Sequence, residues 1–293
     1  MRRRKLLLGS AFSVTAFAEP TLFALIAPPA QGSARAGGQR VGMADVEVLT
    51  QQITHLSKLG QEFGSGRVRE QVVVLLHREA TTLLHGSCSD KTGKALLCGV
   101  AQATRLAGFM AADTGRDALA QRYYIQALDL AMRAGDRLYA AFVLATMSRM
   151  TARTGDNTPT EHDTARHGRQ TVALARAGLT ITQSAATPAL AAELHALEAQ
   201  GLALLGEATA ARRAALTAQR AYESVRPGRG GPVAGLLHQS RAHRGRRLLS
   251  QQCWRDQGDP HPVYHGVAGL GALAGPRPVA GPDPHRPRSP AQP

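Results

Sequence analysis

Residues 101–136 have the sequence AQATRLAGFMAADTGRDALAQRYYIQALDLAMRAGD. Gly108 stands where two antiparallel helices would approach closely, and Thr114-Gly115 interrupts the helical pattern. Three residues after this break share one helical face, at intervals of four and three: Ala120, Tyr124 and Ala127. This order of small residue, turn, small residue, aromatic residue and small residue predicts a hairpin of two packed helices.

The pattern resembles the tetratricopeptide repeat, a helix-turn-helix unit with a glycine in its first helix and an A-x3-F run in its second. Aligning Gly206 with Gly115 brings three alanines onto the same three face positions: Ala211, Ala215 and Ala218. The pattern therefore recurs near the end of the helical region without its aromatic residue.

A looser pair is expected between these two units, with helices near 137–153 and 159–178 joined by a loop that contains Gly155. In the run TPTE (158–161), Thr158 is the expected N-cap and Pro159 the first helical residue. The dipeptide Thr187-Pro188 opens the next helix in the same way. One stripe of that helix is apolar: Leu190, Leu194, Leu197 and Leu204.

Two more amphipathic stretches precede the first hairpin, at 44–60 and 66–85. Their expected buried residues are Val46, Leu49, Ile53, Leu56, Val68, Val72, Leu75, Leu76 and Leu83. No long window alternates with the period of two that a β-strand requires. We therefore predict that residues 41–225 form an all-α, tetratricopeptide-like helical-repeat array, an α-solenoid of four helix pairs with disordered ends.

The net charge of +14 is concentrated at the two ends of the chain. Residues 226–293 contain ten Arg and three Asp, and residues 1–40 contain five Arg, one Lys and one Glu, so the ends carry +7 and +5. The remaining +2 leaves the helical body almost neutral. The high charge is therefore no indication of a DNA-binding face on the body.

Residues 226–293 hold 11 of the 16 prolines and lack the regularly spaced leucines of the body. Such a segment buries too little apolar surface to offset its ordering entropy, so we predict a disordered tail. Its richness in Arg, Gly, Pro, Ala and His is also what GC-rich DNA encodes in a shifted frame. A frameshift near 226–232 is our first interpretation, and a genuine low-complexity tail is the alternative.

Residues 1–40 permit two interpretations. The basic start MRRRK and the apolar run that follows are typical of a secretory signal, covering residues 1–36, with an arginine pair suited to the twin-arginine route. Glu19-Pro20 interrupts the apolar run, and Cys88, Cys98 and Cys253 form no disulfide framework. An apolar and basic interdomain linker accounts for the same residues.

Several stretches in order resemble the region that follows the DNA-reading module in Xre-type helix-turn-helix transcriptional regulators of actinobacteria. They are GGQRVGMADVEVL (37–49), GSGRVRE (64–70), LLHREATTLLHG (75–86) and TGRDALAQRYYIQALDLA (114–131). The resemblance covers about residues 37–225 and implies that the repeats sense a ligand or partner in the cytoplasm. The 40 residues before the repeats leave no room for the DNA reader, so direct DNA binding is not expected.

No group of residues has the spacing of a catalytic, cofactor-binding or metal site, so we predict no enzyme, no cofactor and no site residues. His77, Glu79 and His85 do not converge on a metal as HExxH does. The acidic and histidine residues Glu161, His162, Asp163 and His167 suit a helix start. Cys88 and Cys98 are expected to be ordinary thiols, and Lys91-Thr92-Gly93 has no S-x-x-K nucleophile motif to accompany it.

Candidate binding residues are found only on the repeat. Tyr124 is expected in the core, and Tyr123 faces a neighbouring helix or the solvent. Four polar side chains are candidates for lining a groove, with a solvated face as the alternative: Arg105, Arg116, Arg122 and Gln126. The sequence therefore predicts a non-catalytic module that binds a peptide, protein or small-molecule effector on its repeat groove. Apolar surface left uncovered on its last helix predicts either marginal stability or self-association. An exported helical-repeat protein is the alternative.

Overall fold

The structure is a computed structural model that describes residues 12–26, 34, 38–156 and 160–224. The described residues are helical with no β-strand, which confirms the all-α prediction. The helices are η2 (Val14–Phe17), α1 (Ala18–Ile26), α2 (Met43–Phe63), α3 (Ser65–Leu75), the π-helical turn η3 (Leu76–Ala80), α4 (Thr81–His85), α5 (Asp90–Asp113), α6 (Asp117–Ala134), α7 (Arg137–Gly155), α8 (Glu161–Thr182), η4 (Gln183–Ala185), α9 (Pro188–Leu204) and α10 (Ala208–Glu223). The predicted tail from 226 onward lies outside the described residues.

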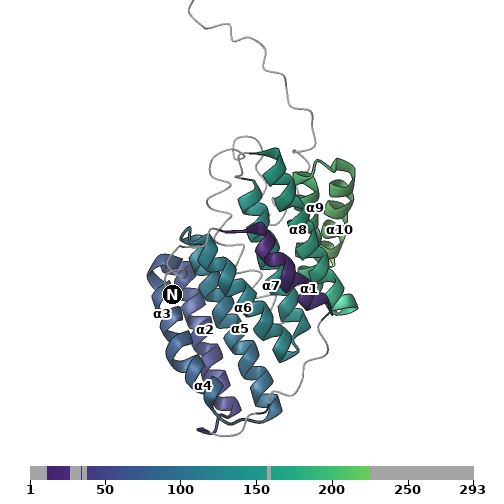
Figure 1. Cartoon of the computed structure of the whole chain (residues 1–293). Helices are drawn as coiled ribbons and strands as arrows, with labels where there is room; N and C mark the ends of the chain where they lie inside the picture. Colours follow the sequence, from purple (N-terminus) through teal and green to yellow (C-terminus); the bar gives the residue numbers. More distant parts are fainter. Residues whose placement is uncertain (1–11, 27–33, 35–37, 157–159, 225–293) are drawn as a thin grey trace, which may run out of the picture.

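Successive helices lie side by side in one row (Figure 1), from α2 and α3 at one end to α9 and α10 at the other. The most extensive contacts are made within three pairs, α5 with α6, α7 with α8 and α9 with α10. The pairs are joined by contacts of α7 with α6 and of α9 with both α7 and α8. At the other end, α2 and α3 pack against each other and against α5.

Three glycines end helices in the same left-handed conformation: Gly115 (φ 75°), Gly135 (φ 76°) and Gly206 (φ 76°). At Gly115 and Gly206 the hydrogen bonds are equivalent. The N–H groups of Arg116 and Glu207 bond to the carbonyl five residues earlier, at 2.8 and 3.0 Å. This is the Schellman arrangement, in which a residue without Cβ reverses the chain at low cost. Gly135 has the same bond, from the N–H of Asp136 to the carbonyl of Ala131 at 3.1 Å, so all three helix ends share one turn type.

The close approach expected at Gly108 is present. A Cβ atom placed there would lie 2.7 Å from Cε1 of Tyr124 and 3.1 Å from Cβ of Tyr123. Tyr124, Ala120 and Ala127 are buried in the main core. Tyr123 is half-buried and packs against the same core. At the three matching positions in α10, Ala218 is buried, whereas Ala211 and Ala215 are only half-buried.

The two expected helix starts have different outcomes. Thr187 is the N-cap of α9, its hydroxyl accepts from the N–H of Leu190, and Pro188 is the first helical residue, as predicted. The start of α8 is two residues later than predicted. Its N-cap is Thr160, because this hydroxyl reaches the N–H of Asp163 at 3.1 Å and the carboxylates of the first turn follow it.

Gly155 is the last residue of α7, so its assignment to a loop is wrong. It is buried where α7 meets α8, because a Cβ atom there would lie 2.6 Å from Cβ of His167. The stretch 66–85 is also divided, since η3 interrupts it and α4 follows as a separate short helix. Leu56, Leu76, Leu83 and Leu204, expected to be buried, are half-buried.

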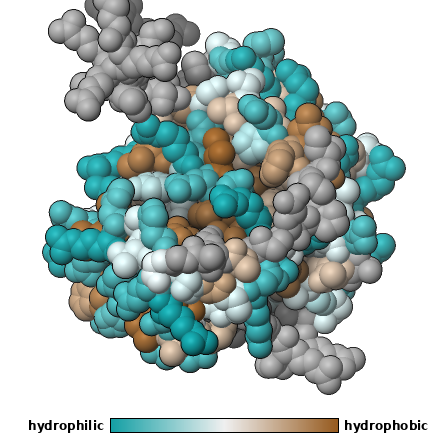
Figure 2. All heavy atoms as spheres, turned by 60° about the horizontal axis from the view of Figure 1, so that its bottom comes forward, coloured by the Kyte–Doolittle hydropathy of each residue, from teal (hydrophilic) through white to brown (hydrophobic). Residues whose placement is uncertain are grey.

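The core consists of two apolar clusters. The larger one extends from α1 to α9, and the smaller one joins α8, α9 and α10. The smaller cluster contains Val172, Ala199, Leu202 and Ala214. Figure 2 shows exposed apolar residues in small patches among hydrophilic ones on the face it presents.

Of the segment expected to be a signal or linker, residues 12–26 contain η2 and α1, which lie across α6 and α8 (Figure 1). Residues 1–11, 27–33 and 35–37 lie outside the described residues. Four residues within 12–26 are buried, at spacings of three, four and three: Val14, Phe17, Thr21 and Ala24. This spacing presents one helical face to the body. Residues 12–26 are therefore packed on the helical body.

Candidate functional site

A buried polar cluster lies between α5 and α7. Arg105 of α5 is only 6% exposed, and its Nε donates to the hydroxyl of Tyr139 on α7 at 3.1 Å. The guanidinium carbon lies 4.9 Å from the centroid of the Phe142 ring, within cation–π distance. For Arg105 the alternative of a solvated face is therefore wrong, because the packing of α5 on α7 covers it.

Asp136 links this cluster to the start of α7. Its Oδ1 accepts from the N–H of Tyr139 at 2.8 Å, which caps the helix, and its Oδ2 accepts from the thiol of Cys98 at 3.3 Å. Gln102 donates to the same sulfur at 3.6 Å. Burial and the charge of Asp136 together raise the pKa of Cys98 to about 12. Cys98 is therefore held as a neutral thiol.

Burial also raises the pKa of Tyr139 to about 12, although the charge of Arg105 acts in the opposite direction. The hydroxyl therefore stays protonated at neutral pH. Since it accepts from Nε of Arg105, its own proton remains available to a further acceptor.

Arg105 has no carboxylate within 4.0 Å among the described residues. Other partly buried arginines of the body are paired, Arg149 with Glu193 and Arg153 with Asp117. The terminal nitrogens of Arg105 also have no hydrogen-bond partner in the same part of the chain. The guanidinium lies over the Phe142 ring without a carboxylate, so an anion brought to its terminal nitrogens would form charge-assisted hydrogen bonds.

A second polar contact is made on the other side of α6, where Gln121 meets the N-terminal segment. The side-chain amide of Gln121 accepts from the N–H of Ser13 at 3.2 Å and donates to its carbonyl at 2.5 Å. Phe12 stacks on the ring of His167 from α8, with the ring centroids 6.1 Å apart. Nδ1 of His167 lies 2.8 Å from the carbonyl of Asp163.

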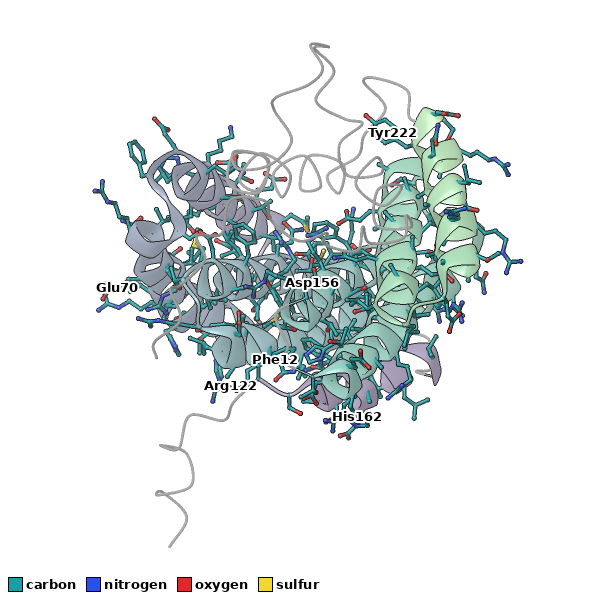
Figure 3. All side chains as sticks on the ribbon, turned by 90° about the horizontal axis from the view of Figure 1, so that it is seen from above. Phe12, Glu70, Arg122, Asp156, His162 and Tyr222 are labelled. Atoms are coloured by element: carbon teal, nitrogen blue, oxygen red, sulfur yellow. The ribbon has the colours of Figure 1, made fainter. Side chains whose placement is uncertain are left out.

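An open pocket of about 490 Å³ lies between α2 and α3. Its polar lining mixes both signs, with Arg67 from α3 and the carboxylates Glu70 and Glu79. Figure 3 places Glu70 at the end of the row opposite α9 and α10. The pocket is therefore separate from Arg105 and from the N-terminal segment.

The residues that the sequence singled out are not brought together. Arg116, Arg122 and Gln126 are exposed, and Figure 3 shows Arg122 on the side of the molecule where Phe12 lies. His77, Glu79 and His85 are all exposed, and Nδ1 of His85 faces the carbonyl of Thr81. Lys91-Thr92-Gly93 belongs to the first turn of α5, which Ser89 caps. Glu161 and His162 are exposed at the start of α8.

Three contacts were missed from the sequence: Arg105 with Tyr139, Cys98 with Asp136, and Gln121 with Ser13. Only the contact of Cys98 with Asp136 had a signal in the sequence. Gly135-Asp136 is a helix stop followed by an N-cap residue, which places the Asp136 carboxylate at the start of a helix. Within the described ranges, no three His, Cys, Asp or Glu side chains form a group that could hold a metal ion.

α5 is the single described helix that is long and apolar enough to cross a membrane, and 72% of its apolar window is buried inside the molecule. A core helix of a folded body passes the same test, so this helix is weak evidence for a membrane span.

No family model, no curated protein and no solved structure matches this chain.

Proposed function

We propose that the chain is a non-catalytic, tetratricopeptide-like module that binds an anionic effector, and that it acts as the regulatory part of an Xre-type transcriptional regulator. One observation carries the binding proposal. Arg105 is buried between the first helices of two successive pairs without a carboxylate partner among the described residues. A carboxylate offered by a peptide C-terminus or a small organic acid would supply the missing charge.

Two features support the repeat interpretation. Left-handed glycine turns at Gly115 and Gly206 each join the two helices of a pair, a turn type that Gly135 also has, and Gly108 lets Tyr124 of the paired helix approach closely. In repeats of this kind each unit packs on the next, and the stacked first helices provide an extended binding surface. The cluster around Arg105 joins the first helices α5 and α7.

Binding is tested with short peptides that have either a free or an amidated C-terminus. We expect the free-carboxylate peptides to bind the wild-type protein, and Arg105→Met to weaken this binding at least about tenfold, since charge-assisted hydrogen bonds contribute roughly 1.5–3 kcal/mol. Arg122→Met is the matched control on an exposed position. Equal titration curves for Arg105→Met and the wild type would reject the site.

The regulator interpretation rests on the resemblance of residues 37–225 and is tested at the locus. We expect the nucleotide sequence upstream of the Met1 codon to contain a helix-turn-helix reading frame, and a repeat-like frame to continue past codon 227. A locus with neither extension would leave a free-standing repeat protein.

We further propose that the module works in the cytoplasm. The supporting observation is that Phe17 is fully buried in the main cluster, so cleavage of a signal covering residues 1–36 would uncover an apolar site on the body. A reporter fused to residues 1–40 tests this. Export that is abolished by Arg2→Lys/Arg3→Lys/Arg4→Lys would favour the twin-arginine alternative instead.

A further inference from the structure

The surface formed by α6 and α8 holds a backbone segment through one glutamine. Both polar atoms of the Gln121 amide bond to the backbone of Ser13, 108 residues away. A primary amide has the same donor and acceptor pair as a peptide bond, so this contact fixes a chain in place whatever its side chains are. Gln121 is 5% exposed and Ser13 is exposed, so the contact is partly buried.

Aromatic side chains on either side of Ser13 give the contact its specificity. Phe12 stacks on His167 of α8, and the ring of Phe17 meets that of Phe12 edge to face, with centroids 6.1 Å apart. Phe17 is completely buried, and Phe12 is half-buried. An aromatic pair around a clamped backbone is the kind of anchor that dominates helix recognition.

The docked helix is apolar on both of its faces. Thr21 and Ala24 of α1 are buried against the body, next to Phe17 of η2. On the other face, Leu22, Phe23 and Leu25 are 58%, 47% and 43% exposed. α1 also has Glu19-Pro20 in its first turn and spans only nine residues. The segment therefore has one face covered by the body and a second apolar face exposed, and a helix this short depends on its docked anchors for its structure.

We propose that the α6–α8 surface is a recognition site for a short helix of a partner protein that is anchored by two phenylalanines, and that residues 12–24 occupy it in cis. The partner helix carries a Phe-Ser pair at its start and a second Phe five residues after the first. Because the chain's own segment is tethered, its effective concentration is in the millimolar range, and a partner binds only by displacing it. Docking of residues 12–24 is thus an autoinhibitory contact. It is independent of the site at Arg105.

The probe is a fluorescein-labelled peptide of residues 11–26, AFSVTAFAEPTLFALI, measured by anisotropy against the full chain. In the chain variant Phe12→Ala/Phe17→Ala the cis segment loses its anchors. We expect this variant to bind the probe about tenfold more tightly than the wild type, because the cis competitor no longer fills the surface. A probe that itself lacks both phenylalanines should not bind.

The second arm tests the clamp. Gln121→Leu, added to the double variant, should weaken binding of the probe by about three- to tenfold, since it removes two hydrogen bonds while keeping the side-chain volume. Arg122→Leu, on the next and exposed position, should leave binding unchanged. Should the double variant fail to fold, as judged by circular dichroism, Phe12→Ala alone replaces it, because Phe12 is only half-buried.

Three results would overturn the proposal. A folded variant that does not bind the probe would make the segment a fixed part of the core. Equal affinities of the wild type and the variant would remove the autoinhibition. Concentration-dependent dimers of the wild type in sedimentation, abolished by the double variant, would show that the surface takes the segment of a second copy instead of a partner helix.

Discussion

Gly108 is the residue on which the spacing of α5 and α6 depends. An added Cβ atom would lie 2.7 and 2.8 Å from two ring carbons of Tyr124. We expect Gly108→Ala to lower the free energy of unfolding by about 1–3 kcal/mol, because this steric cost exceeds the roughly 0.5–1 kcal/mol that alanine gains in a helix. Urea unfolding measures it.

Gly66 provides the matched control for this substitution. It lies near the start of α3, and the nearest atom to an added Cβ is Cγ2 of Thr114 at 3.7 Å, an ordinary contact. Gly66→Ala should therefore leave the free energy of unfolding unchanged or raise it by up to about 0.5 kcal/mol. If Gly108→Ala behaves like Gly66→Ala, the close approach of α5 and α6 is not tight.

The raised pKa of Cys98 predicts that the folded protein loses stability at alkaline pH. Its pKa is raised from 9.0 to about 12 in the folded protein, so the folded state holds this proton more tightly than the unfolded chain. The stability that the protonated Cys98 thiol contributes is therefore complete below about pH 9 and is lost as the pH rises from 9 towards 12. The raised pKa of Tyr139 adds a further loss of stability between pH 10.0 and about pH 12.

The measurement is the free energy of unfolding between pH 8 and pH 11, for the wild type and Cys98→Ala. We expect the wild type to lose about 1 kcal/mol more per pH unit above pH 9 than the variant, since each titrating proton contributes at most roughly 1.4 kcal/mol per unit. Parallel curves would mean that Cys98 titrates normally in the folded state.

At the scale of the helix, α10 is held less firmly than the helices before it. Its buried residues are only Ala214 and Ala218, Leu216 is 54% exposed, and it belongs to the small cluster with Val172. α7, in contrast, is buried along most of its length. Local opening should therefore cost less free energy in α10 than in α7.

Hydrogen exchange measures this difference. We expect the amides of α10 to exchange at least about a hundredfold faster than those of α7, which corresponds to roughly 3 kcal/mol less protection. Ala215→Leu, at a half-buried position packed against the small cluster, tests the cause by adding apolar contact. Uniform protection from α5 to α10 would contradict the prediction and indicate one cooperative unit.

At the scale of the whole molecule, residues 12–26 contribute to the stability of the body. They bury Val14 and Phe17 against it, and full burial of such side chains contributes about 1.5–3 kcal/mol each. We expect a chain that begins at residue 37 to unfold at lower urea concentration, with a loss of about 2–4 kcal/mol, and to bind a hydrophobic dye. Unchanged stability would favour a segment that is removed in the mature protein.

Most of the helical pattern could be predicted because its causes are local. The period of 3.6 residues, the glycines that accept a left-handed turn and the Thr187-Pro188 cap act over one or two turns of chain. Errors arose where neighbouring residues could do the same task. Thr158 and Thr160 are both suitable caps, and Thr160 is the one whose hydroxyl reaches Asp163.

The amino-acid sequence was sufficient to specify helices, their turns and the tight contact of Gly108 with Tyr124, because neighbouring helices of a hairpin meet in a fixed register. The candidate sites depend on contacts between distant residues. Arg105 meets Tyr139 across 34 residues, and Gln121 meets Ser13 across 108. Such pairs follow from how the helices stack, and packing alone determines which polar side chain is buried and which faces solvent.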